Sequence, residues 1–490
     1  MRHTLYHKMM LHAAAPAMAA VLTLGSCSDF TDVAQKGKNL LSTTTELEML
    51  LNQEMDPGSA SDFRQMINDR LYAFSNVASQ ISQPNKTRNV IIWTWDEQQM
   101  DKMAELTASD GDYQTFYGYI GRIANPILSK IDGAKGTDNV RSQLKCEALT
   151  LRAWSNFILI NKFAKAYNPA TASEDPGIIN MTEDVDITVP QSQSTVQQIY
   201  DQILADCDAA IQLDALPAAA VNRMRWSKAC PYAVKAMALL NMQKWTEAEA
   251  AAKQALAISP DLCNYWDASM QTTTKGNILG GTYPVILRER LKAVEDYFLT
   301  YNLEFFGPVP TESWEAFEQG HAFKDLMTTD RLMYDNVMGM GANMLGLDYT
   351  ITYDLNSVWN PYGLTSAQMY LAVAECEIHQ GHIDAAMDYI DRLRATRINP
   401  QVYRPLQGSV TTEAEAIAHL KQVTHDEYIY TAYHFISLKR WNQVTGWQQT
   451  LSRTIDGTTY TLKPDSKLWI FPFPQNAINN NPNLKQNYNR

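Results

Sequence analysis

The chain has 490 residues, of which 45% are hydrophobic and 19% charged, and this composition excludes an intrinsically disordered protein and a small disulfide-stapled one. Its 41 Lys and Arg against 53 Asp and Glu give a net charge of −12, and no basic block is dense enough to neutralise a phosphate backbone. We therefore expect no nucleic-acid partner, whereas 24 Tyr and 11 Trp supply many flat apolar faces with a polar edge.

The N-terminal segment has the features of a secretion signal. Two basic residues precede an apolar stretch over residues 9–24, which is too short to span a bilayer comfortably. The stretch ends in Leu-Gly-Ser-Cys at Cys27, a pattern that resembles the lipobox of bacterial lipoproteins, whose Cys carries the lipid. We therefore predict a signal peptide over residues 1–26 and a mature chain anchored to a membrane by acyl chains on Cys27. The alternative is an ordinary signal peptide followed by an incidental Cys.

Acidic residues follow Cys27 at Asp29 and Asp32, and this arrangement resembles a surface-export signal of some Gram-negative lipoproteins. It predicts an outer-membrane protein that faces the cell exterior. No later apolar run is long enough to span a membrane, so we expect the folded body to lie in water.

The remaining cysteines lack the spacing of a disulfide framework or of a metal site, because none forms a CxxC pair. Most of them fall in stretches with a helical pattern, where a thiol behaves as a small apolar residue. We expect five buried cysteines: Cys146, Cys207, Cys230, Cys263 and Cys376.

The first long helical pattern lies over residues 141–163. Its apolar side chains recur on one face, while Arg152 and Lys162 are expected to project elsewhere. Thr195 and Gln198 form a capping box that opens a second helix, which we expect to pack antiparallel to the first.

The next segment has the pattern of a tetratricopeptide repeat, in which small residues let two helices approach closely. Residues of the required types stand at Tyr232, Ala236, Leu239, Ala248, Ala255 and Pro260. A further unit follows over residues 370–386, with Gly381 where the chain must reverse. We predict tetratricopeptide-like helix pairs at about 141–260 and 365–400.

Gly and Pro punctuate residues 262–361, so we expect this part to be loop-rich. Short strands are expected over residues 90–95, 349–354 and 458–462, the last after a hairpin turn at Asp456-Gly457. The predicted fold class is mostly α: a scaffold of tetratricopeptide-like helix pairs, packed with a loop-rich second half that carries minor short strands.

Motifs in three parts of the chain point to one family. An Ala-Leu-Thr-Leu-Arg-Ala-Trp run over residues 148–154 leads on to Gly177-Ile178, and Leu438-Lys439-Arg440-Trp441 fits a Leu-x-Arg-Trp helix end. The chain closes with Pro-Phe-Pro-Gln over residues 472–475 and Asn-Pro-Asn-Leu-Lys-Gln-Asn over residues 481–487. Together these motifs resemble the SusD/RagB family of nutrient-binding outer-membrane lipoproteins.

The resemblance implies a single SusD-like α-helical domain over residues 27–490, poorly matched only over residues 263–361. It also implies a protein that captures glycans or peptides without catalysis and closes as a lid over its partner, a SusC-like TonB-dependent transporter. One departure concerns a segment where the family commonly has Glu-Gly-x-Arg. This chain has Thr431-Ala432-Tyr433-His434 instead and so lacks the Arg that supplies polar interactions there.

Trp93 and Trp95 are the best candidates for sugar binding, because a sugar ring stacks its C–H face on an exposed aromatic plate. In an extended chain the two rings fall on the same side, with Asp96 beside them for the hydroxyl rim. The resemblance supports this choice, since glycan-binding members place binding aromatics in a comparable early loop. The alternative is that both rings pack into the core.

Tyr283 and Trp359 are further candidate ligand contacts, because nearby Gly and Pro suggest surface loops. We therefore expect the ligand-binding part at about residues 60–100 and 262–361. Four other tryptophans lie within helical repeats and are expected to be packing residues: Trp154, Trp226, Trp245 and Trp441.

No motif in the sequence supports catalysis. His379 and His382 have HxxH spacing, but Gly381 breaks the helix between them and no Glu follows, so we expect solvated turn histidines. No ligand cluster at a suitable spacing suggests a metal ion or a cofactor.

The leading interpretation is a surface glycan-binding lipoprotein that captures oligosaccharides and delivers them to a SusC-like transporter. In a second interpretation the ligand is a peptide, as for RagB-type members. A third is a helical-barrel glycoside hydrolase, which release of reducing ends by the purified protein would support. A fourth is a repeat scaffold that binds only protein partners.

Overall fold

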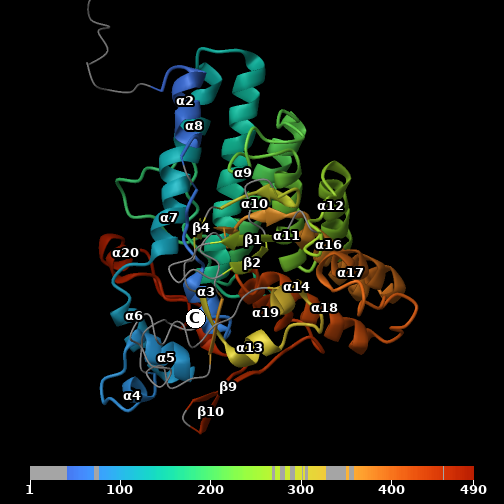
Figure 1. Cartoon of the computed structure of the whole chain (residues 1–490). Helices are drawn as coiled ribbons and strands as arrows, with labels where there is room; N and C mark the ends of the chain where they lie inside the picture. Colours follow the sequence, from blue (N-terminus) through green and yellow to red (C-terminus); the bar gives the residue numbers. More distant parts are fainter. Residues whose placement is uncertain are drawn as a thin grey trace, which may run out of the picture.

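The computed structural model describes residues 41–53, 55–70, 77–267, 271–275, 282–286, 293–300, 302–303, 307–326, 349–352, 358–455 and 457–489. The predicted signal peptide and Cys27 lie outside these residues. Within them helices dominate and strands are short, as the sequence predicts (Figure 1). None of the described helices is both long enough and apolar enough to cross a membrane.

The N-terminal part consists of short helices, of which the first and the last two pack on one long helix. They are α2 (Thr44–Leu51), α3 (Ser61–Met66), α4 (Val77–Ile81), α5 (Arg88–Thr94), α6 (Met100–Leu106), α7 (Gly111–Tyr119) and α8 (Asn125–Lys130). Single turns η1 (Glu97–Gln99), η2 (Ile120–Ala124) and η3 (Ile131–Gly133) join them. α7, η2 and α8 follow one another along the side of the long helix α9 (Asp138–Phe163) (Figure 1).

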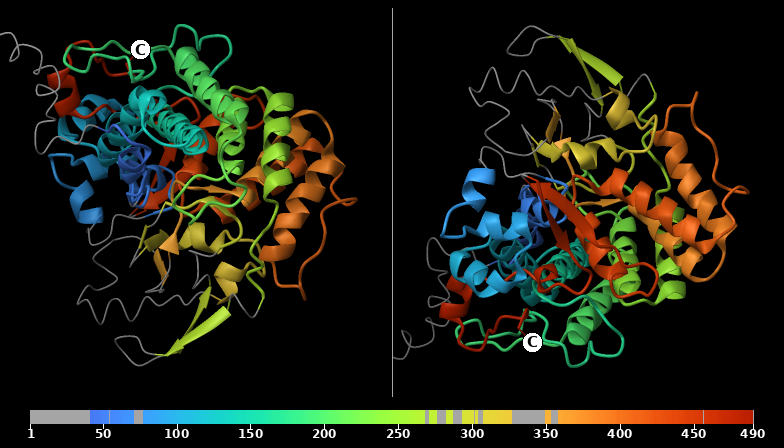
Figure 2. Two further views of the ribbon diagram at one scale, coloured as in Figure 1. Left: turned by 90° about the horizontal axis from the view of Figure 1, so that it is seen from above. Right: turned by 90° about the horizontal axis from the view of Figure 1, so that it is seen from below.

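The long helices form a row in which each packs on the next. After α9 these are α10 (Val196–Leu213), α11 (Ala229–Asn241), α12 (Trp245–Ile258), α16 (Ser366–His379), α17 (Ile383–Arg397), α18 (Glu413–Tyr428) and α19 (Tyr433–Trp441). α12 packs directly on α16, although residues 262–361, the central region of the chain, lie between them in the sequence. The helix pairs expected at 141–260 and 365–400 therefore stack into one scaffold, which runs from teal through green to orange in Figure 2.

Local sequence signals set the ends of these helices. The predicted capping box is present at the start of α10, where Thr195 and Gln198 exchange hydrogen bonds of 2.9 and 3.2 Å. Gly381 has a φ of +80° between α16 and α17, a conformation that glycine adopts without strain. Both predictions are confirmed.

α9 and α10 run antiparallel, as predicted. Cys146 Sγ lies 3.4 Å from the carbonyl of Ala210, while Tyr200, near the start of α10, lies beside Asn161, near the end of α9. Arg152 and Lys162, which are expected to project elsewhere than the apolar face of α9, do not reach solvent. Both are buried, because carboxylates from neighbouring segments neutralise them: Arg152 binds Asp206 through two hydrogen bonds of 2.8 Å.

The core of the scaffold is built around stacked aromatic rings. Trp154 packs edge-on against Phe116, Trp226 and Phe298, and its indole N–H donates to the carbonyl of Tyr362 at 2.9 Å. Trp154, Trp226 and Trp441 are buried and Trp245 is half-buried against the same core, so the packing role predicted for these four is confirmed. The five predicted cysteines are buried, and none of them forms a disulfide within the described residues.

The described strands form antiparallel pairs. These are β1 (Gln271–Lys275) with β2 (Thr282–Ile286), β3 (Asp296–Phe298) with β8 (Leu364–Thr365), β4 (Asn302–Leu303) with β7 (Val358–Trp359), β5 (Gly307–Pro310) with β6 (Tyr349–Thr352), and β9 (Leu451–Ile455) with β10 (Thr458–Leu462). The pairs β3–β8, β4–β7 and β5–β6 are nested, so the central region returns to the point at which it leaves the scaffold. The strands expected at 349–354 and 458–462 are confirmed by β6, up to Thr352, and by β10.

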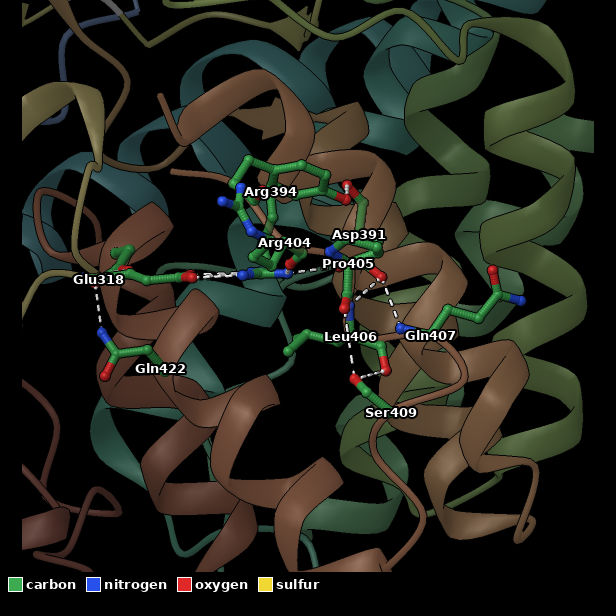
Figure 3. Close-up of polar contacts among 11 residues, drawn as sticks. Glu318, Asp391, Arg394, Arg404, Pro405, Leu406, Gln407, Ser409 and Gln422 are labelled. Atoms are coloured by element: carbon green, nitrogen blue, oxygen red, sulfur yellow. Dashed lines mark hydrogen bonds and ion pairs between the residues drawn. The ribbon is translucent and has the colours of Figure 1, made fainter. Parts of the chain in front are cut away.

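The central region is also tied to the second half of the scaffold by a polar network around Arg394, drawn in Figure 3. Arg394, on α17, donates to both carboxylate oxygens of Glu318, which follows α13 (Thr311–Glu315), and to Asp391. Asp391 in turn accepts the backbone N–H groups of Leu406 and Gln407 at 2.7 and 2.8 Å. One buried guanidinium thus holds three separate segments together.

Short helices complete the described chain: α14 (Ala322–Leu326), the single turn η6 (Lys467–Trp469) and α20 (Gln475–Asn480). The segment that departs from the family pattern, 431–434, lies at the start of α19. There His434 Nδ1 lies 2.6 Å from Asp69 Oδ2, and the Tyr433 hydroxyl donates to the carbonyl of Tyr362 at 2.5 Å. In this chain a histidine and a tyrosine join this segment to residues that are distant in the sequence.

Candidate functional site

Trp93 and Trp95, the two tryptophans predicted to bind a sugar, lie at the end of α5. This helix begins after Thr87, whose hydroxyl accepts the backbone N–H of Val90, and it ends at Trp95, whose φ of +45° is left-handed. The strand expected over residues 90–95 is therefore wrong. A short apolar run such as Val-Ile-Ile-Trp fits a buried helix as well as a strand, and here the cap at Thr87 starts a helix.

Both indoles are buried, so the expectation of two open rings on one side of the chain is wrong as well. Trp93 is 1% exposed and packs with Val90 and Ile455. Trp95 is 5% exposed, and its indole N–H donates to the carbonyl of Met66 at 2.8 Å. The core-packing alternative thus describes their position in this structure, while their role as ligand contacts stays a prediction.

Arg453 of β9 fixes the turn that contains these tryptophans. Its guanidinium lies 4.3 Å above the ring of Trp95 and donates to the carbonyl of Trp93 and to Asn68 Oδ1. Burial lowers the pKa of Arg453 to about 9. The cation–π contact and the hydrogen bonds hold the end of α5 in one conformation.

The other predicted contacts lie in different parts of the molecule. Asp96 follows Trp95 and is half-buried, and its backbone N–H donates to the carbonyl of Ile91. Tyr283 lies in β2 opposite Thr274, and Trp359 lies in β7 opposite Asn302; the structure describes the backbone of these two strands. Cys27 lies outside the described residues.

A polar cavity of about 450 Å³ opens beside the start of α5. Its walls come from residues 57–62, from Arg88, from residues 106–112 and from Lys162 near the end of α9. The cavity falls partly within the 60–100 segment expected to bind a ligand. Its lining contains hydroxyl and charged groups but no aromatic ring.

Lys162 is the centre of the charges in this cavity. Its Nζ lies 2.7 Å from Asp110, 2.6 Å from Asp112 and 3.0 Å from Asp62, and Arg88 forms a two-pronged contact with Asp62 at 2.8 and 3.0 Å. Lys162 is buried, yet it has a full set of carboxylate partners. The cluster can therefore stay ionised at the edge of the core.

The pKa values of this cluster follow from burial and from these contacts. Burial alone would lower the pKa of Lys162, but the charges of the three carboxylates raise it above its ordinary value. Burial would raise the pKa of Asp62, but the charges of Lys162 and Arg88 bring it well below its ordinary range. Burial raises the pKa of Asp112, although Lys162 opposes the rise. Chemically, the cavity offers fixed charges and hydrogen bonds to a hydroxyl-rich ligand.

Sequence reasoning missed the residues of this cavity. Asp62, Arg88, Asp110 and Lys162 come from segments that are distant in the sequence, and no local motif links them. The one signal was Asp110-Gly111-Asp112 before an aromatic helix, since Asp110 caps α7 through the backbone N–H of Tyr113 at 2.8 Å. It predicts a helix start and gives no indication of a charged cavity.

The histidine pair has no metal-like arrangement. His379 is packed between the rings of Trp245 and Trp447, with ring centroids at 3.8 and 4.1 Å, so the expectation of a solvated ring is wrong for this residue. His382 is exposed, as expected, and lies 2.8 Å from Glu377. In the part of the chain that the structure describes, no group of three or more His, Cys, Asp and Glu could hold a metal ion.

Two family models match the chain. One, described as starch-binding associating with outer membrane, matches residues 29–240, and the model of the SusD family matches residues 366–489. The unmatched stretch between them contains the central region for which the sequence resemblance was poor. No curated protein matches the chain significantly.

Solved structures share the fold over almost the whole chain at low sequence identity. A putative sugar binding protein from Bacteroides vulgatus is 14% identical with a TM-score of 0.63, and covers 92% of this chain and 99% of its own. A surface glycan-binding protein A from Bacteroides uniformis is 15% identical with a TM-score of 0.62, and covers 91% of this chain and 100% of its own. A SusD superfamily protein from Bacteroides thetaiotaomicron is 16% identical with a TM-score of 0.60, and covers 91% of this chain and 99% of its own.

Proposed function

Because this chain belongs to the SusD/RagB family, we propose that it is a surface lipoprotein that captures oligosaccharides and delivers them to a SusC-like TonB-dependent transporter without catalysis. The observation that carries the proposal is the match at residues 29–240 to a starch-binding, outer-membrane-associated family, which begins just after the predicted lipid-bearing Cys27. A putative sugar binding protein with the same fold over 92% of this chain supports a sugar as the ligand.

The electrostatics of the scaffold support binding without catalysis. A glycosidase needs a carboxylic acid and a carboxylate that both face the substrate. Two buried carboxylates of this scaffold instead bind arginines: Glu375 lies 2.6 and 2.9 Å from Arg440, and Glu147 lies 2.6 and 2.7 Å from Arg225. These contacts fix the carboxylates as structural counter-ions.

The ligand-contact assignment stays as proposed from the sequence: Trp93, Trp95, Asp96, Tyr283 and Trp359. Of the first three, Asp96 is the only side chain that is not buried in this structure. The polar cavity around Lys162 adds charged groups beside the start of α5. We propose that sugar hydroxyls bind along this edge.

Calorimetry with a panel of neutral and acidic oligosaccharides tests the proposal on the purified chain from residue 27. We expect saturable binding with a Kd between micromolar and millimolar, as suits capture and onward release. Asp96→Ala should weaken the binding about three- to tenfold, because one hydrogen bond to a hydroxyl is lost. Asp132→Ala, at an exposed carboxylate that pairs with Lys145, is the matched control and should leave the Kd unchanged.

Other outcomes would contradict the proposal in distinguishable ways. Saturable binding of peptides with no glycan bound would favour a RagB-like function. Release of reducing ends by the purified protein would show a glycoside hydrolase. Absence of a TonB-dependent transporter from material that co-purifies from outer membranes would contradict the delivery step.

A further inference from the structure

A second cavity, of about 370 Å³, lies beyond the C-terminal end of α9. It is lined by the segment after α9, by α19 and Gln443, by residues 464–470 and by Tyr488. Its volume is that of a small-molecule site. It shares no lining residue with the cavity around Lys162.

Lys439 of α19 lies in the wall of this second cavity and is only 2% exposed. Its Nζ donates to the carbonyls of Asn161 and Ala164 at 2.7 and 2.6 Å, at the end of α9, where the carbonyls lack partners within the helix. The ring of Phe435 also lies near this ammonium, with its centroid 5.7 Å from Nζ. An ammonium has three N–H groups, so a third donor remains beyond these two hydrogen bonds. Among the described residues no carboxylate forms an ion pair with Lys439.

Lys439 and Lys162 differ in the partners of their ammonium groups. Both ammonium groups are buried near the end of α9, but Lys162 has three carboxylate partners and Lys439 has two carbonyls. A buried cation without an anion is costly, and the negative end of the helix dipole of α9 offsets only part of that cost. An anion that enters the cavity would supply the missing partner.

The rim of the cavity carries further groups suited to an anionic sugar. Lys467 is exposed, Lys165 is half-buried with Asp175 at 2.6 Å, and the side-chain amide of Gln443 is exposed. Trp469 adds an apolar wall. The charged and titratable groups that line the cavity with Lys439 are Lys165, Asp175, Asp465, Lys467 and Tyr488.

We propose that this cavity binds the anionic group of an acidic sugar, a carboxylate or a sulfate, with Lys439 at its floor and Lys467 and Gln443 at its rim. The sugar part of this inference rests on the proposed function; the anion part rests on the cavity alone. Lys439 acts as a fixed donor, and no covalent step is involved.

The protonation state of Lys439 should make the affinity for an acidic sugar depend on pH. Burial lowers the pKa of Lys439 to about 7. A bound anion favours the charged form, so it raises this pKa and binding takes up a proton when the pH exceeds about 7. Affinity for an acidic sugar should therefore fall as the pH rises from 7 to 9, whereas a neutral sugar bound elsewhere should show no such fall.

Calorimetry on the full mature chain tests the inference with three probes: an oligogalacturonide, a sulfated galactose oligosaccharide and a neutral galactose oligosaccharide. Lys439→Met keeps the apolar stem but removes the charge, and we expect it to weaken binding of an acidic probe about ten- to a hundredfold. The galacturonide and sulfate arms show which anionic group is the ligand. Lys421→Met is the matched control, since Lys421 also donates to a carbonyl, that of Trp447 at 2.6 Å, but lies outside the cavity.

Lys439→Met also removes a cap of α9, so its fold is checked by circular dichroism. If Lys439→Met does not fold, two other measurements test whether the cavity binds the anionic group. These are the affinity of Lys467→Ala, at an exposed rim residue, and the pH dependence of binding by the wild-type chain. Equal affinities for the acidic and neutral probes would overturn the inference. So would an affinity for the acidic probes that changes neither with pH nor in a folded Lys439→Met or Lys467→Ala variant. If the inference fails but the neutral oligosaccharide still binds, the proposed function is not contradicted. If free galacturonate binds through Lys439 but no oligosaccharide binds, only the proposed function is contradicted.

Discussion

Trp95 is held from several sides at once. Its left-handed backbone ends α5, its indole N–H donates to the carbonyl of Met66, and the guanidinium of Arg453 covers its ring. A ring fixed in this way contributes to the cohesion of the N-terminal helices. It can contact a ligand only if this packing opens.

Replacing Trp95 should therefore lower stability before it affects anything else. We expect Trp95→Ala to reduce the free energy of unfolding by about 3–5 kcal/mol, because a buried ring is removed and a cavity is left. Chemical denaturation measures this change, with Trp95→Phe as a milder control that keeps an aromatic ring. A Trp95→Ala protein of native stability that no longer binds oligosaccharide would show instead that the indole is a ligand contact.

The two tryptophans also show where residue-level prediction from the sequence reaches its limit. The aromatic content and the adjacent Asp96 predicted exposed rings in this segment, but the exposure of its rings depends on partners far away in the chain. Arg453 lies in β9, and Ile455, which packs on Trp93, lies in the same strand. No pattern within residues 90–96 encodes these contacts.

At the scale of single elements, helix caps account for much of the local order. Thr412 begins α18 through a capping box: its hydroxyl accepts the backbone N–H of Glu415 at 3.3 Å and donates to the Glu415 carboxylate at 2.8 Å. α18 carries Gln422, which donates to the carbonyl of Ala316 and so helps to hold the segment after α13. Fraying of this helix would loosen the network in Figure 3.

Thr412→Ala should reduce the free energy of unfolding by about 1 kcal/mol, since the backbone N–H of Glu415 loses its side-chain acceptor and the Glu415 carboxylate loses the hydroxyl that donates to it. Thr411→Ala is a matched control, because Thr411 is an exposed neighbour whose side chain makes no hydrogen bond among the described residues. Denaturant titration compares the two variants with the wild-type chain. Equal stabilities for both would mean that the start of α18 contributes nothing to the folded state.

Elements with local signals were predictable, and those that depend on distant partners were not. The capping box at Thr195, the turn at Gly381 and the strand at 458–462 each follow from residues adjacent in the sequence. By contrast, the nested pairing of β3 with β8 depends on two segments on either side of the central region. The cavity around Lys162 is of this second kind.

On the scale of the whole molecule, the Lys162 cluster joins the N-terminal helices to the scaffold. Asp62 comes from α3, Asp112 from α7 and Lys162 from α9, and the hydroxyl of Tyr362, next to β8, donates to Asp112 at 2.6 Å. Segments that are distant in the sequence therefore meet at one buried ammonium group.

The stability of this junction should depend on pH. The pKa of Asp62 is lowered in the folded chain by the charges of Lys162 and Arg88, although burial opposes this, so its contribution is present above its unfolded pKa of about 3.9 and is lost as the pH falls below it. At pH 7 Asp62→Asn should reduce the free energy of unfolding by about 1–3 kcal/mol, since the charged partner of Arg88 and Lys162 is removed. The difference between wild type and variant should persist at pH 5 and shrink at pH 3.

Denaturant titrations at these three pH values measure the difference directly. Asp132→Asn is the control, because Asp132 is exposed and its pair with Lys145 is worth little at a surface. Its difference from wild type should be small at every pH. If Asp62→Asn lowered the free energy of unfolding by the same amount at every pH, packing around the side chain, and not its charge, would hold α3 to α9. The Lys162 cluster would then be a consequence of that packing and not its cause.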